Sequence, residues 1–236
     1  MIDDILITAR PLGEYRAMFS LTDADLALPV LDCAAGASAF TAEVNAAGGD
    51  ATACDPRYAE HPATLDALTR SETLRGNEFV RRHHDDYQWS FYRDPDDHLA
   101  RRMLACRRFV DDITAHPERY VAGSLPDLPF DDASFGLVVS SHLLFSHADK
   151  LDERFHLEAL REMCRVSSGE VRVFPLVASG STPAPDVAAL LEALDGEHID
   201  TEIRPVDYEF QRGADRMLVC HSRAAAENRV QDHPTA

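Results

Sequence analysis

The chain has 236 residues, enough for one α/β domain with a substantial hydrophobic core. Its formal net charge is −18, so the surface field should repel polyanions, and nucleic acid is not an expected partner. The N-terminus lacks a basic start followed by an apolar run, and no apolar run reaches the roughly 18 residues that span a bilayer. These features predict a cytoplasmic protein with no membrane partner.

Cysteine and histidine patterns argue against a disulfide framework or a metal site. The five cysteines are odd in number and widely spaced in apolar segments, which predicts reduced, buried thiols. His83 and His84 precede two aspartates, but adjacent residues on a helix point in different directions, and no second cluster has ligand spacing. We therefore predict no metal site.

In chain order, apolar runs alternate with amphipathic segments. The run 28–34 predicts a strand that is buried on both faces, and 38–47 predicts a helix with Ser38 as its N-cap and Gly48 as its stop. Further strands are predicted at 50–55, 120–122, 135–141, 170–176, 199–205 and 216–221, and further helices at 95–113, 151–166 and 186–194.

This alternation predicts an α/β fold with a doubly wound, mostly parallel sheet of seven strands in a single domain, 1–236. The link between the last two strands is too short for a crossover helix. The last strand should therefore run antiparallel to its neighbour.

The stretch 30–40, VLDCAAGASAF, spans the first strand, the turn after it and the start of the first helix. Open α/β sheets bind ligands at this position, and the small residues would let the backbone approach one closely. Asp55, at the end of the second strand, could accept hydrogen bonds from two ribose hydroxyls. The stretch is either a nucleotide-binding turn that has lost glycines or a plain strand running into a helix.

The segment 123–144, GSLPDLPFDDASFGLVVSSHLL, carries a resemblance that favours the first interpretation. Its LPFDDASFGLVVSS resembles the LPFxDxSF motif and following strand of small-molecule class I S-adenosylmethionine-dependent methyltransferases. The resemblance covers about 29–174 apart from one insertion. It implies a Rossmann-like methyltransferase fold, S-adenosylmethionine as cofactor, and methyl transfer to an O or N atom of a small-molecule acceptor.

The same resemblance implies the site residues. It puts Asp32, Ala34 and Gly36 at the methionine end of the cofactor, Asp55 at the ribose, Ser124 and Leu125 beside the adenine, and Ser140, Ser141 and His142 along the wall near the sulfonium. His142 is the candidate base, and the alternative is a histidine that caps the strand end. Ala34 and Ser38 depart from the family pattern, because they replace the outer glycines.

More than 60 residues separate Asp55 from the third strand, which predicts an inserted helical cap, 60–118, beside the cofactor cleft. An aromatic cluster within it supplies Trp89 and Tyr92 as candidate substrate-binding residues, with His98 as a weaker one. The alternative is that the aromatics simply pack the insert onto the sheet. The helix arginines Arg101, Arg102, Arg107 and Arg108 are expected to pair with its aspartates at the surface.

Two other functions are open at this point. A nicotinamide-dependent oxidoreductase would share the first two strands and Asp55, but Phe40 and Thr41 fall near the position of its third glycine. A non-catalytic module could keep the fold and bind the cofactor without methylating anything.

Overall fold

The computed structural model describes residues 5–178 and 186–222. Its elements, apart from short 3₁₀ turns, are α1 (Leu12–Phe19), α2 (Asp23–Leu26), β1 (Pro29–Cys33), α3 (Phe40–Ala46), β2 (Asp50–Cys54), α4 (Pro62–Arg82), α5 (Pro95–Ala115), β3 (Tyr120–Val121), β4 (Phe135–Ser141), α6 (Glu153–Val166), β5 (Ser167–Phe174), α7 (Val187–Gly196), β6 (Ile199–Pro205) and β7 (Arg216–Ser222).

The seven strands form one sheet in the order β3-β2-β1-β4-β5-β7-β6. Strands β1 to β5 pair in parallel, whereas β7 is antiparallel to both β5 and β6. This is the predicted α/β fold, the Rossmann-like arrangement of methyltransferases with its antiparallel last strand. The prediction that the final link would reverse the chain is confirmed.

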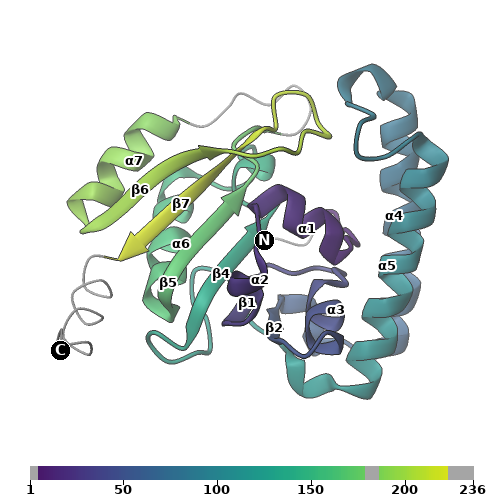
Figure 1. Cartoon of the computed structure of the whole chain (residues 1–236), viewed down its shortest axis with the longest axis horizontal. Helices are drawn as coiled ribbons and strands as arrows, with labels where there is room; N and C mark the ends of the chain where they lie inside the picture. The colour runs from purple at the N-terminus through teal and green to yellow at the C-terminus, as the bar shows by residue number, and fades with distance from the viewer. Residues whose placement is uncertain (1–4, 179–185, 223–236) are drawn as a thin grey trace.

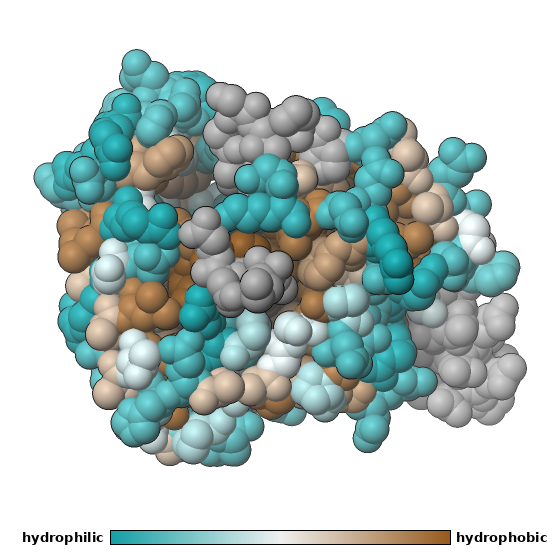
Figure 2. All heavy atoms as spheres, turned by 180° about the vertical axis from the view of Figure 1, so that it is seen from behind, coloured by the Kyte–Doolittle hydropathy of each residue, from teal (hydrophilic) through white to brown (hydrophobic). Residues whose placement is uncertain are grey.

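Helices cover both faces of the sheet (Figure 1). Leu31 belongs to the apolar cluster that contains α6 and α7, and Val30, one residue earlier, belongs to the cluster that contains α1 and α3. This alternation explains why β1 reads as a continuous apolar run, since a strand covered on both faces buries every side chain. The face shown in Figure 2 presents mostly hydrophilic side chains, with hydrophobic ones between them.

Helices α4 and α5 form a long antiparallel hairpin at one side of the molecule (Figure 1). Helix α5 begins with Pro95 at its first position, and the Asp94 carboxylate accepts hydrogen bonds from the amides of Asp96 and Asp97. Its buried side chains pack with alanines of the β1–α3 turn, in a cluster that includes Ala35, Ala37 and Ala105. The hairpin therefore covers the sheet beside that turn.

Sequence periodicity located the strands well. The strands 135–141 and 199–205 begin and end as predicted, and the bounds of the other predicted strands and helices differ by at most three residues. Helices α1, α2 and α4 were not predicted individually. All five cysteines are free and buried, as expected. Among the described residues, no helix combines the length and apolar character that crossing a membrane requires.

A buried carboxylate joins α1 to distant parts of the chain. Glu14 is fully buried and accepts hydrogen bonds from Tyr92 (2.7 Å), Tyr208 (2.7 Å) and the Nη2 of Arg102 (2.8 Å). The expectation that Arg102 pairs at the helix surface is wrong, because its side chain turns inward to Glu14. Arg101, by contrast, does pair with Asp97 on its own helix, at 3.0 Å.

We predict that Glu14→Ala lowers the free energy of unfolding by about 3–5 kcal/mol, since it leaves the charge of Arg102 buried without its carboxylate. Urea unfolding measures this loss. Glu78→Ala, which removes an exposed glutamate of α4, is the matched control and should cost less than about 0.5 kcal/mol. A loss below about 1 kcal/mol for Glu14→Ala would contradict the structural role assigned to this network.

Candidate functional site

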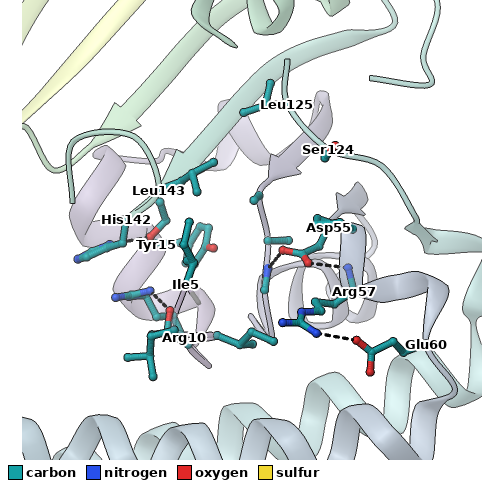
Figure 3. Close-up of a pocket in the computed structure, with 18 residues that line it drawn as sticks. Ile5, Arg10, Tyr15, Asp55, Arg57, Glu60, Ser124, Leu125, His142 and Leu143 are labelled. Atoms are coloured by element: carbon teal, nitrogen blue, oxygen red, sulfur yellow. Dashed lines mark hydrogen bonds and ion pairs between the residues drawn. The ribbon is translucent and has the colours of Figure 1, made fainter. Parts of the chain in front are cut away.

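A cavity of about 480 Å³ lies at the carboxyl ends of β1, β2 and β4 (Figure 3). This size is typical of small-molecule sites. The predicted site residues that line it are Ala34, Gly36, Asp55, Ser124, Leu125, Ser141 and His142. They come from four separate chain segments, so the fold brings together most of the residues proposed for the cofactor.

Gly36 forms the turn after β1. Its φ is +58°, a left-handed conformation that glycine adopts without strain. Its amide donates to the Asp55 Oδ2 at 3.0 Å, and its carbonyl accepts from the Tyr58 hydroxyl at 2.8 Å. The turn is thereby held against the end of β2.

Asp55 follows β2 and faces this turn, with only 7% of its surface exposed. Its Oδ1 accepts from the Arg57 amide at 3.0 Å, so each carboxylate oxygen is anchored by one backbone amide. Burial raises the pKa of Asp55, and the hydrogen bonds from Arg57 and Gly36 oppose that rise. Because an oxygen of a carboxylate has two lone pairs, each can accept one further hydrogen bond from a ligand.

Ser141 and His142 form the cavity wall at the end of β4. The Ser141 hydroxyl and the His142 Nδ1 lie 2.9 Å apart, and the His142 amide donates to the Phe174 carbonyl at 2.7 Å. Burial, followed by the positive charges of Arg10 and Arg102, holds the pKa of His142 well below its usual value. The ring is therefore neutral near pH 7.

Two predicted residues lie behind the cavity wall. Asp32 and Ser140 are fully buried, and the Asp32 Oδ2 and the Ser140 Oγ have no hydrogen-bond partner within the described parts of the chain. The Asp32 Oδ1 accepts from the Tyr15 hydroxyl at 3.2 Å. Burial raises the pKa of Asp32 to about 7, so this carboxyl titrates near neutral pH.

The predicted substrate-binding residues lie outside the cavity lined by described residues. Tyr92 is fully buried and donates to Glu14, and His98 is buried with its ring 5.2 Å from that of Phe210. Trp89 is half-buried and lies edge-to-face with the same Phe210, at 5.4 Å. These contacts match the alternative interpretation, in which the aromatics pack the insert.

Sequence reasoning missed the N-terminal part of the cavity. Thr8, Arg10 and Tyr15 line it, because the segment before α1 crosses the β1–α3 turn. There the Ala37 amide donates to the Thr8 carbonyl, and the Ala39 amide donates to the Arg10 carbonyl at 2.9 Å. No local pattern marks these residues, since their position depends on contacts with a distant turn.

The known proteins that resemble this chain do so at low sequence identity. No family model matches the sequence. An uncharacterized protein of Methanocaldococcus jannaschii is 26% identical over 223 residues, which cover 92% of this chain and 96% of that protein. Two solved structures of methyltransferases can also be superposed over 89% of this chain.

The first of these is magnesium protoporphyrin IX methyltransferase from Synechocystis PCC 6803 with bound S-adenosylmethionine. It has 10% identity, 76% of its chain covered and a TM-score of 0.49. The second is an S-adenosylmethionine-dependent methyltransferase from Aquifex aeolicus, with 11% identity, 95% of its chain covered and a TM-score of 0.43. At these identities the likeness concerns the fold alone, which the strand order already establishes.

The raised pKa of Asp32 predicts how stability changes with pH. The unfolded carboxyl ionises near pH 4, whereas the folded one holds its proton to about pH 7. Ionisation between these values favours the unfolded state, so the contribution of Asp32 to stability falls from pH 4 to pH 7 and then levels off. Asp32→Asn cannot ionise. The free energy of unfolding of Asp32→Asn minus that of wild type should therefore increase by up to about 4 kcal/mol between pH 4 and pH 8.

Urea unfolding of both proteins across this pH range measures the difference. Asp50→Asn is the control, because Asp50 is exposed at the opposite end of β2 from the cavity. Identical pH profiles for wild type and Asp32→Asn would show that Asp32 titrates like an ordinary carboxylate.

Proposed function

We propose that this protein is an S-adenosylmethionine-dependent methyltransferase that methylates an O or N atom of a small-molecule acceptor. The observation that carries the proposal is the cavity, in which Gly36, Asp55 and His142 meet at the ends of three neighbouring parallel strands. Ligands of open α/β sheets bind at this edge. The net charge of −18 further supports a small molecule over a nucleic acid as acceptor.

The cavity fits the cofactor in three respects. Gly36 forms a left-handed turn that brings the backbone to the cavity wall, the Asp55 carboxylate keeps acceptor capacity for two ribose hydroxyls, and Leu125 offers an apolar wall for the adenine. When bound, S-adenosylmethionine supplies an activated methyl group on a sulfonium centre. The chain itself would hold the donor and the acceptor in line and exclude water.

The region after the β1 turn disfavours the oxidoreductase alternative. Phe40, near the position of the third glycine of a dinucleotide motif, is fully buried and stacks on Tyr15 with ring centroids 4.7 Å apart. A glycine at that position would allow close packing of helix on strand, and the phenyl ring fills this space instead.

The role of His142 follows from its environment. A neutral imidazole can accept a proton, but burial and nearby arginines disfavour the imidazolium that would result. The site is therefore better suited to an acceptor that is already anionic or is a neutral amine, for which no proton need be removed before attack. His142 would then contribute mainly to the shape of the wall near the acceptor.

Asp55→Ala should weaken S-adenosylhomocysteine binding by more than tenfold, because each hydrogen bond to a charged acceptor contributes about 1.5–3 kcal/mol. Isothermal titration calorimetry measures the affinity, with NAD titrated in parallel to test the oxidoreductase alternative. The control is Asp50→Ala, at the far end of the same strand, which should bind like wild type. If Asp55→Ala also binds like wild type, the cofactor does not contact Asp55.

Gly36→Val should abolish cofactor binding while the protein stays folded. A β-branched side chain is strained at a φ of +58°, and its Cβ would lie 3.5 Å from the Thr8 carbonyl oxygen, so the turn that lines the cavity would have to shift. Circular dichroism checks folding, and calorimetry checks binding. Gly13→Val, in α1, is the control, since a Cβ there meets nothing within 4 Å. Unchanged affinity in a folded Gly36→Val protein would favour the plain strand–turn–helix interpretation.

A further inference from the structure

Two buried arginines share one carboxylate beside the cavity. Arg10 and Arg102 are 7% and 6% exposed, and both lie near Glu14, which is fully buried. Arg102 donates to Glu14 at 2.8 Å, whereas the Nε of Arg10 is 3.6 Å from the nearest Glu14 oxygen. The two cations and one anion leave a surplus positive charge in this part of the protein.

The hydrogen bonds assign that surplus to Arg10. Glu14 already accepts from Arg102 and from two tyrosine hydroxyls, which uses most of the capacity of a carboxylate. Each of the three nitrogens of Arg102 has a partner, since it also donates to the Ala9 carbonyl and to the Nε2 of His98. Arg10 donates through Nη1 to the Thr8 hydroxyl, and its Nε has no hydrogen-bond partner among the described residues.

The side chain of Arg10 lines the cavity. Figure 3 shows Arg10 on the same side as Tyr15 and His142, and Asp55, Arg57 and Glu60 on the other side, where Arg57 pairs with Glu60 at 3.0 Å. The His142 imidazole beside it is neutral and contributes no charge. Asp32, a buried carboxyl whose pKa Arg10 lowers, nevertheless has its pKa raised by burial to about 7 and is therefore only partly ionised at neutral pH.

A buried guanidinium without a full set of partners is costly, and burial followed by repulsion from Arg102 lowers the pKa of Arg10. An anion in the cavity would relieve this cost. Carboxylate is the best match, because its two oxygens suit the planar fork of a guanidinium and form short, charge-assisted hydrogen bonds.

We propose that Arg10 is the carboxylate-binding residue of the cavity, on the side opposite Asp55. The inference rests on the proposed function and gives the cavity two ends, one that binds hydroxyls and one that binds an acid. The carboxylate belongs either to the methionine part of the cofactor or to an acidic acceptor. Both sources have the same chemistry, and two titrations separate them.

The first titration compares S-adenosylhomocysteine with 5′-methylthioadenosine, which has the adenosine and sulfur but lacks the amino-acid carboxylate. If the carboxylate is the cofactor's, Arg10→Gln should weaken S-adenosylhomocysteine at least tenfold and leave methylthioadenosine unchanged. Arg10→Lys, which keeps the charge but loses the fork, should give an intermediate affinity. The unchanged methylthioadenosine affinity also shows that the variant is folded.

The second titration adds benzoate, a simple aromatic acid, to protein saturated with S-adenosylhomocysteine. If the carboxylate is the acceptor's, wild type should bind benzoate and Arg10→Gln should lose that binding at least tenfold, with S-adenosylhomocysteine affinity unchanged. Arg16→Gln is the matched control in both titrations, because Arg16 pairs with Asp23 at the surface of α1. It should behave like wild type.

The proposal is overturned if both titrations fail. In the first, Arg10→Gln would bind S-adenosylhomocysteine as tightly as wild type. In the second, saturated wild type would bind no benzoate, or Arg10→Gln would bind benzoate as tightly as wild type. An equal loss of S-adenosylhomocysteine and methylthioadenosine would also overturn it, since Arg10 would then act on the fold of the site. Failure of the wild type to bind either adenosine compound is a different result, because it contradicts the proposed function itself.

Discussion

The site depends on the buried carboxylate of Glu14, which links three parts of the chain that the sheet does not join. Its partners come from the α4–α5 hairpin (Tyr92, Arg102) and from the link between β6 and β7 (Tyr208). A buried carboxylate is tolerated only when its lone pairs are used, so these groups hold α1 in one position. That position lays the segment before α1 across the β1–α3 turn, where its backbone and side chains close the cavity.

Charged side chains line two sides of the cavity, and Arg57, on the Asp55 side, pairs with Glu60 at 3.0 Å. Asp55 is anchored by backbone amides at the end of β2, Arg10 lies on the other side, and the His142 imidazole between the sheet and Arg10 is neutral. In a partly desolvated space such fixed charges orient a polar ligand more strongly than they would in water. A ligand with hydroxyls at one end and an anionic group at the other would therefore have one preferred direction of binding.

How far sequence predicts this structure depends on the range of the interactions. Strands and most helices follow from local apolar patterns, and Gly36 and Asp55 could be placed because parallel topology puts consecutive strand ends at one edge. Arg10 could not be placed, since nothing near it in sequence indicates that its carbonyl accepts from the Ala39 amide, 29 residues later. The aromatic cluster around Trp89 was visible, but its partner Phe210 comes from the far end of the chain.

The hairpin affects the cavity indirectly. Its helices pack through alanines and Phe109 onto the β1–α3 turn, and its Tyr92 and Arg102 donate hydrogen bonds to Glu14. Because Arg102 occupies Glu14, it deprives Arg10 of a full counter-ion and leaves that guanidinium available to the cavity. An insertion that contributes no side chain to the cavity wall beyond Glu60, within the described residues, can in this way set the charge of the wall. A change at Arg102 would therefore alter which ligands the cavity prefers without any change among the residues that line it.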